Sequence, residues 1–121
     1  MKIASFLCFI IISLSSLFAQ EIDDRLLYKY SQEELQTMID TDSDQYDMLE
    51  YALDNAIYIA NYDSAKGGNF ETISVDLNAL PTFIELGLEV TDRNQYFKIA
   101  GEEKLLVVKS AVVLNYEMKK K

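Results

Sequence analysis

DQYDMLEYALDNAIYIANY, residues 44–62, is the stretch of this sequence that decides the fold. Its apolar side chains recur at the spacing of one helix face: Tyr46, Leu49, Leu53, Ala56, Ile57 and Ala60. A second set widens that face: Met48, Ala52, Ile59 and Tyr62. This periodicity predicts one long amphipathic helix over residues 44–62, with a cap supplied by Asp42, Ser43 or Asp44.

A shorter helix is predicted before it. Ser31 followed three residues later by Glu34 forms a capping box, which marks a helix start. Tyr30 precedes the cap and can pack on Leu35 as a hydrophobic staple. We therefore expect a helix over residues 32–39.

The pattern changes after a loop at residues 64–69. Residues 70–75 alternate between apolar and polar and are rich in β-branched side chains, which is typical of a half-buried strand. Pro81 suits the first turn of a short helix over residues 82–86, and Gly87 stands where a C-terminal cap belongs.

The last third of the chain predicts a β-hairpin from residues 96–99 and 104–109. Ser110 can cap a final helix over residues 111–118, although the β-branched residues there also fit an edge strand. We therefore expect an α+β domain, with N-terminal helices, one of them long and amphipathic, packed on a small antiparallel sheet of about three strands.

The N-terminus has the order of a cleavable signal peptide. Met1 and Lys2 are followed by an apolar stretch and by small residues ending at Ala19. We expect cleavage after Ala19, with Ser16 as the second choice, which divides the chain into a signal at residues 1–19 and one acidic domain at residues 20–121. A retained anchor is the alternative, but a span needs about 20 apolar residues and serines interrupt this one. Cys8 lies in the middle of the stretch, unlike the acceptor of a lipid anchor.

Charge is distributed unevenly along a chain whose net charge is −9. Residues 21–63 hold 12 acidic side chains against Arg25 and Lys29, whereas residues 64–121 hold eight of each sign. This balance argues against nucleic acid as a partner, because phosphate binding needs a basic stripe and the one basic cluster is residues 119–121. Anionic lipid would repel the acidic half, so no stable membrane insertion is expected after signal cleavage.

The inventory of reactive side chains argues against an enzyme. The chain has no histidine, and its one cysteine, Cys8, leaves with the signal. Ser-His-Asp and Cys-His systems are thereby excluded, as are zinc sites built on these residues. A carboxylate-based hydrolase would draw on Asp47, Glu50 and Asp54, but a solvated helix face explains that spacing. We therefore expect no catalytic residue and no cofactor apart from Ca²⁺.

Asp40, Asp42 and Asp44 are the candidate ligands for Ca²⁺ or another cation, because alternate aspartates supply the oxygen ligands that hard cations prefer. The stretch begins like an EF-hand loop but has Gln45 where that loop needs glycine and Tyr51 where it needs glutamate. An acidic turn that caps the next helix explains the same residues.

Tyr51, Tyr58 and Tyr62 are spaced along one flank of the predicted long helix. Exposed, they would form a partner-binding patch, since tyrosine combines a large contact area with a polar tip. Buried, they would be the shoulder of an ordinary core.

The chain resembles short exported proteins of unknown role from Bacteroidota-type Gram-negative bacteria. The resemblance rests on the signal ending at residues 17–20, on SQEEL at residues 31–35 and on KLLVVKS at residues 104–110. It implies a cell-envelope location, foremost the periplasm, with release outside the cell as the second location, and it brings no site residue with it. The function that we expect from the sequence is therefore a non-enzymatic periplasmic accessory or protein-interaction domain with an envelope protein as partner.

Overall fold

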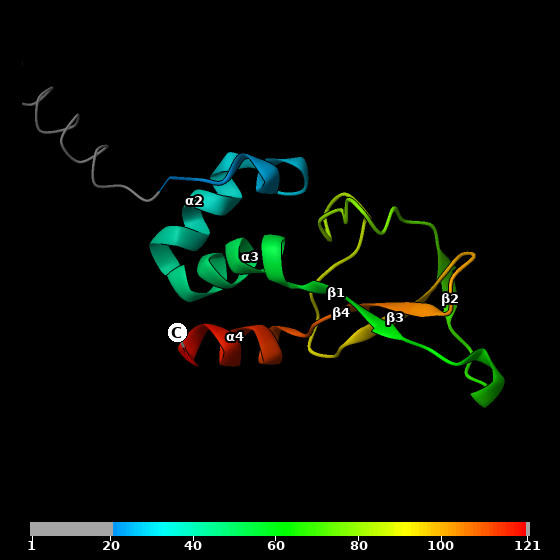
Figure 1. The fold of residues 1–121 in the computed structure, drawn as a ribbon. Coiled ribbons are helices and arrows are strands. Elements are labelled where there is room, and N and C mark those ends of the chain that lie inside the picture. Colours follow the sequence, from blue (N-terminus) through cyan, green and yellow to red (C-terminus); the bar gives the residue numbers. More distant parts are fainter. Residues whose placement is uncertain (1–20, 121) are drawn as a thin grey trace, which may run out of the picture.

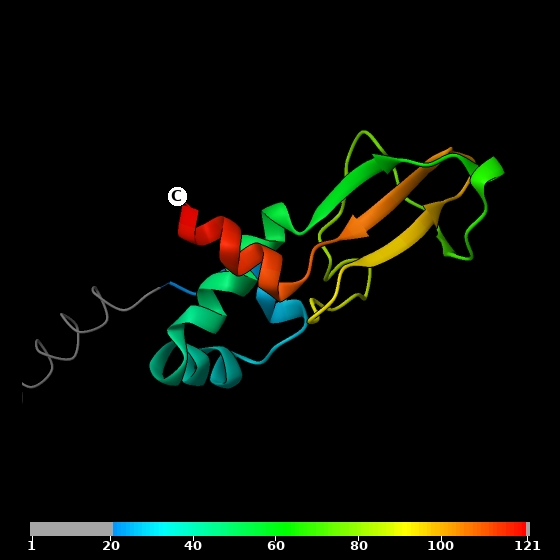
Figure 2. The same cartoon turned by 90° about the horizontal axis from the view of Figure 1, so that it is seen from below.

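A computed structural model describes residues 21–120, and the predicted signal peptide at residues 1–19 lies outside them. The α-helices gather at one end of the molecule, and a four-stranded sheet extends away from them (Figure 1). The predicted α+β class is confirmed. The helices do not lie across the sheet as expected, because α3, which leads into β1, and α4, which follows β4, both lie beyond the same end of the sheet (Figure 2).

The helical end begins with the 3-10 helix η1, Asp24–Tyr28, followed by α2, Gln32–Thr41, and α3, Ser43–Asn55. The predicted capping box is confirmed: Ser31 Oγ accepts from the Glu34 N–H at 3.1 Å, and Glu34 Oε1 accepts from the Ser31 N–H at 3.2 Å. Asp42 both ends α2 and caps α3, with its Oδ1 accepting from the Gln45 N–H at 3.3 Å. Two short helices therefore meet at one shared cap.

The predicted long helix over residues 44–62 is wrong in its second half. The helix ends at Asn55, and β1, Ile57–Asn61, follows. Ala56 joins the two, since its N–H donates to the Ala52 carbonyl at 3.0 Å and its carbonyl accepts from the Lys109 N–H at 2.8 Å. Pairing with a distant strand therefore overrides a helical periodicity that the β-branched Ile57 and Ile59 only weakly support.

The sheet has four strands in the order β1-β4-β3-β2. β3, Gln95–Ile99, and β4, Lys104–Val108, form the predicted hairpin, and β1 pairs antiparallel with the other edge of β4. β2, Glu71–Ile73, pairs parallel with β3. The expected antiparallel sheet of about three strands is thus a mixed sheet of four, and the strand expected over residues 70–75 is only three residues long.

Residues 74–94 cross one face of the sheet without forming a helix or strand (Figure 1). The short helix predicted over residues 82–86 is a single turn: Gly87 N–H donates to the Ile84 carbonyl at 3.0 Å and Leu88 N–H to the Phe83 carbonyl at 2.9 Å. Gly87 has φ +70°, as the closing residue of such a turn requires. The turn buries Phe83 completely.

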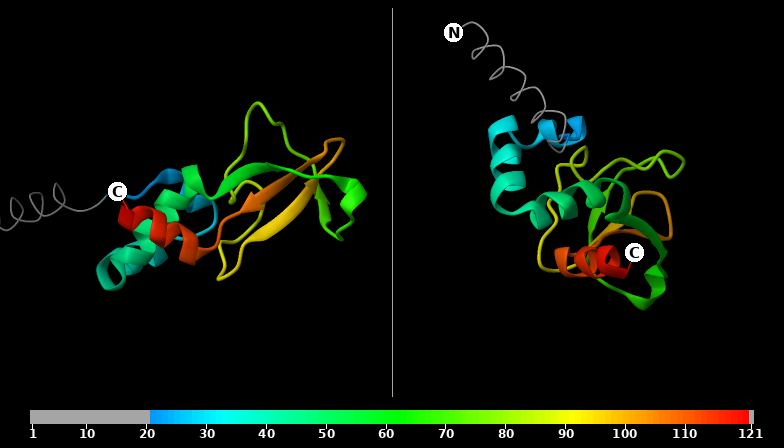
Figure 3. Two further views of the ribbon diagram at one scale, coloured as in Figure 1. Left: turned by 60° about the horizontal axis from the view of Figure 1, so that its bottom comes forward. Right: turned by 90° about the vertical axis from the view of Figure 1, so that its left-hand side faces the viewer.

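The final helix is confirmed, and the edge-strand alternative is wrong. α4 is Ala111–Lys120, and Ser110 Oγ accepts from the Val113 N–H at 3.2 Å as its cap. α4 lies beside α3 at the helical end (Figure 3). The Tyr51 hydroxyl donates to Glu117 Oε1 at 3.0 Å across this contact.

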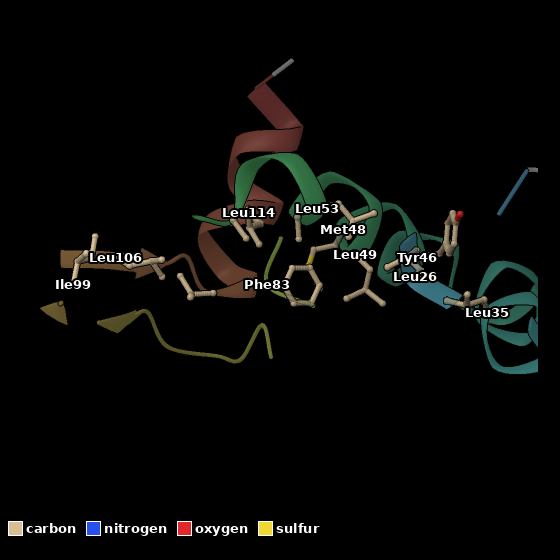
Figure 4. Close-up of a cluster of buried hydrophobic side chains, with 13 residues drawn as sticks. Leu26, Leu35, Tyr46, Met48, Leu49, Leu53, Phe83, Ile99, Leu106 and Leu114 are labelled. Atoms are coloured by element: carbon tan, nitrogen blue, oxygen red, sulfur yellow. The ribbon is translucent and has the colours of Figure 1, made fainter. Parts of the chain in front are cut away.

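One apolar core runs from the sheet through residues 74–94 into the helices (Figure 4). Phe83 lies between side chains of the sheet and those of α3 in that view. The fully enclosed members come from every layer: Leu26, Leu35, Tyr46, Ala56, Phe83, Leu106, Val108 and Leu114. The helical end and the sheet therefore depend on the same apolar core for their stability.

Replacement of Phe83 by alanine tests this shared core. We expect Phe83→Ala to lower the free energy of unfolding by about 3–5 kcal/mol, because it leaves a cavity where the two ends meet. Urea unfolding followed by circular dichroism would measure it. Leu80→Ala is the matched control, since Leu80 is 43% exposed and we expect a loss of less than about 1 kcal/mol. Equal losses in the two variants would contradict the shared core.

Candidate protein-binding site

Alternation along the strands gives the sheet two different faces. Ile57, Ile59, Phe97, Leu106 and Val108 point into the core beneath residues 74–94. The opposite face is formed by the intervening residues, and we call it the open face: Tyr58, Ala60, Thr72, Tyr96, Lys98, Leu105 and Val107. Figure 2 shows the strands from a side on which no other segment lies in front of them.

Two tyrosines and a valine form the centre of the open face. Val107 on β4 is paired with Tyr58 on one side and with Tyr96 on the other. Val107 is only 1% exposed, whereas Tyr58 is 41% and Tyr96 45% exposed. The rings therefore shield the aliphatic centre while presenting their own surfaces to solvent.

Phe70 and Tyr62 extend this aromatic surface at the far end of the sheet. The centres of the Phe70 and Tyr96 rings lie 6.3 Å apart. The Tyr62 ring meets the Phe70 ring edge-on, with their centres 5.5 Å apart. The Tyr62 hydroxyl also donates to the Gly67 carbonyl at 2.9 Å. We call Tyr58, Tyr62, Phe70 and Tyr96 the aromatic cluster.

Gly68 permits this arrangement. It has φ +120°, and a Cβ there would lie 2.7 Å from Cε2 of Phe70. A side chain at this position would displace the Phe70 ring and strain the backbone. Gly68 is therefore the position that lets the Phe70 ring approach the backbone.

A cation borders the cluster on the side of the helices. Lys109 Nζ lies 5.6 Å from the centre of the Tyr58 ring, within the range of a cation–π interaction. The same atom pairs with Glu117 Oε2 at 2.7 Å. This charge network fixes Tyr58 relative to α4.

The structure separates the three tyrosines predicted to share a helix flank. Tyr51 lies on α3, half-buried, and donates to Glu117. Tyr58 lies on β1, and Tyr62 follows that strand on the same side. The common flank is wrong because the helix ends at Asn55. Sequence reasoning also missed Phe70 and Tyr96, whose alternation within predicted strands was the available signal.

The three candidate calcium ligands are not gathered into one site. Asp42 caps α3, and Asp40 Oδ1 accepts from Gln36 Nε2 at 3.1 Å. Asp44 lies in the first turn of α3, where the helix dipole favours negative charge. Within residues 21–120, no three His, Cys, Asp or Glu side chains are grouped as metal ligands. The geometry of this turn supports the capping explanation.

Asp47, Glu50 and Asp54 line one open depression on the helical end, together with Arg25 and Met118. Arg25 donates to Asp54 Oδ1 at 2.8 Å and to Asp23 Oδ2 at 2.9 Å, which ties η1 to α3. Hydrogen bonds from Arg25 lower the pKa of both carboxyl groups. Asp54 is therefore unsuited to donate a proton near neutral pH.

Tyr46 is the one completely enclosed tyrosine of the described residues. Burial raises the pKa of its hydroxyl, which accepts from the Asp23 N–H at 2.9 Å and lies 3.1 Å from Glu50 Oε2. The hydroxyl anchors the start of the described chain against α3. The burial of Tyr46 is therefore explained by a structural role.

Comparison with known proteins finds no matching family model, no matching curated protein and no matching solved structure. No helix within residues 21–120 has both the length and the apolar character that crossing a bilayer requires. The site must therefore be interpreted from its own geometry.

The Arg25 pairs predict a pH-dependent contribution to stability. Since the folded-state pKa values of Asp23 and Asp54 are lowered, this contribution is present above the unfolded pKa near 3.9 and is lost as the pH falls. We expect Arg25→Gln to cost about 0.5–1 kcal/mol at neutral pH, because solvent screens these partly exposed pairs.

Urea unfolding of the wild type and Arg25→Gln should show this difference falling toward zero as the pH drops from about 4 to about 2. Arg93→Gln is the matched control, because Arg93 is exposed and forms no ion pair with a described residue. A difference for Arg25→Gln that persists at acid pH would argue that the guanidinium acts by packing alone.

Proposed function

We propose that this protein is a non-enzymatic accessory or interaction domain of the cell envelope, which binds a partner protein through its open face. The observation that carries the proposal is the row Tyr58, Val107 and Tyr96, in which two half-exposed rings flank a buried valine. Tyrosine is enriched at the energetic centres of protein interfaces.

The shape of the surface favours a macromolecule over a small ligand. Small molecules bind in concave pockets that enclose most of their surface, whereas a sheet face is broad and shallow. The aromatic cluster offers rigid contact area at low cost in side-chain entropy, and its tyrosines add polar tips that can hydrogen-bond to a partner. A protein surface with an apolar centre and polar rim complements it.

The proposed location is the periplasm. It rests on the N-terminal sequence alone, whose basic start, apolar stretch and small exit residues are those of an exported precursor. The partner proposed is accordingly a protein of the cell envelope.

Loss of the Tyr96 ring tests the binding face. We expect Tyr96→Ala to weaken partner binding at least about tenfold, as truncation of a central interface aromatic does. Affinity capture from the native envelope, quantified by mass spectrometry, would compare it with the wild type. Tyr116→Ala is the matched control, because Tyr116 is 60% exposed and belongs to α4, not to a strand of the sheet.

A protein captured by the wild type and Tyr116→Ala but lost with Tyr96→Ala would support the proposal. If no captured protein responds to Tyr96→Ala, the open face is not the binding site.

The proposed export makes a separate prediction. The protein expressed from its full reading frame should be recovered from the periplasmic fraction with the intact mass of a chain that starts at Gln20. Ala19→Arg should block processing and leave the longer precursor, because signal peptidase requires a small residue there. Recovery of the unprocessed wild type from the cytoplasm would reject both cleavage and location.

A further inference from the structure

The outer edge of β1 is the most exposed hydrogen-bonding edge of the sheet. β1 is an edge strand of five residues, whereas β2 at the opposite edge has only three. No strand pairs with the outer edge of β1, and in Figure 2 no helix or strand lies alongside it, although a loop within residues 74–94 passes behind the strand and extends beyond it. An open edge of this kind is a template for pairing with another strand.

The hydrogen bonds of β1 show which groups are unused. Tyr62 N–H donates to the Glu103 carbonyl, and Lys109 N–H donates to the Ala56 carbonyl. Even-numbered residues therefore face β4, and the N–H and C=O groups of Ile57, Ile59 and Asn61 point outward. None of these outward groups has a hydrogen-bond partner among residues 21–120.

The side chains of β1 do nothing to block pairing. The strand IYIAN contains no charge and no proline, which are the usual protections of an exposed edge. Ile57 and Ile59 are only half-buried, since the core covers them from one side. A further strand beside them would complete their burial.

We propose that the β1 edge pairs with the β1 edge of a second copy of this chain, antiparallel and about a two-fold axis at Ile59. Centring the axis there pairs all five residues and uses every outward group. Tyr58 of one copy then stands opposite Ala60 of the other, so a large side chain meets a small one. The strand is thus complementary to itself.

Charge selects this antiparallel arrangement of two copies. The helices α2 and α3 carry acidic residues and no basic ones, and α3 leads directly into β1. Antiparallel pairing places the acidic helical ends of the two copies at opposite ends of the paired strands. Their separation is about 17 Å, the length of a five-residue strand, which exceeds the electrostatic screening length of about 8 Å. Parallel pairing would set them side by side.

The paired sheet would also carry both open faces on one side, because the axis is perpendicular to the sheet. Tyr58 and Tyr96 of both copies then form one continuous surface. The dimer therefore extends the proposed binding face, but it does not depend on that proposal.

Asn61→Pro tests the edge. Proline removes an N–H that points to solvent in the single chain, and Asn61 itself is exposed, so the fold should be kept. In the dimer two symmetric hydrogen bonds to Ile57 are lost, which should raise the dissociation constant roughly 30-fold. Asn61→Ala is the matched control, because it removes the same side-chain contact with Lys104 but keeps the N–H.

Sedimentation velocity over a series of concentrations would measure the dissociation constants, with circular dichroism to confirm the fold of each variant. We expect reversible dimers from the wild type and Asn61→Ala, and mostly monomer from Asn61→Pro. The proteins should be expressed from the full reading frame and purified as the cell processes them.

Ile59→Cys supplies an independent test. At the two-fold axis the paired Cα atoms lie about 5.5 Å apart, so a short bis-maleimide can bridge the two thiols. Treatment with this reagent should therefore give a covalent dimer. Ile57→Cys should not, because in this register residue 57 lies opposite Asn61, and the wild type controls for any contribution of Cys8.

A wild type that sediments as a monomer at every concentration would overturn the proposal. So would a dimer that Asn61→Pro leaves unchanged and Ile59→Cys does not cross-link, since it would use another surface. Either result leaves the response of partner capture to Tyr96→Ala as a separate question.

Discussion

The hydrogen bond from Lys109 N–H to the Ala56 carbonyl, 2.8 Å long, is the contact on which the architecture depends. It joins the point where α3 becomes β1 to the point where β4 approaches α4. Because β1 and β4 are antiparallel, α3 enters the sheet and α4 leaves it at the same end. Glu117 secures this arrangement by accepting from both Tyr51 and Lys109.

Local signals in the sequence identified the elements whose ends are set by neighbouring residues. The capping box at Ser31, the hairpin of β3 and β4 and the cap at Ser110 all involve partners close in the chain. The break at Ala56 has a different origin. Residues 56–62 fit a helical face as well as a strand, and only the pairing of Ile57–Asn61 with β4, far along the chain, decides between them.

The same limit explains how much of the site was predictable. Tyr58 and Tyr62 were singled out as either an exposed patch or the shoulder of a core, but their assignment to a helix separated them from Tyr96. The aromatic cluster exists only because β4 brings β1 and β3 to its two sides. The glycines before Phe70 indicated a loop, while the close approach of that ring to Gly68 required the folded chain.

Local rules account for the cap at Asp42 but not for the pairing of Asp54. Asp42 serves as a cap, and Asp54 is paired with Arg25 across to η1. That pairing joins segments 29 residues apart and leaves no mark in the spacing of either one. The pKa of Asp54 is accordingly a tertiary property that composition alone does not contain.

The position of β1 in the sheet also has a consequence for biosynthesis. β4 meets β3 across a tight turn, but it meets β1 only after residues 62–103 have been made. A ribosome delivers the N-terminal part first, so β1 emerges well before the strand that covers its inner edge. During that interval both edges of β1 are open. Its sequence, IYIAN, is uncharged and rich in β-branched residues, as aggregation-prone segments are. Holding the nascent chain extended until β4 has emerged would protect this strand.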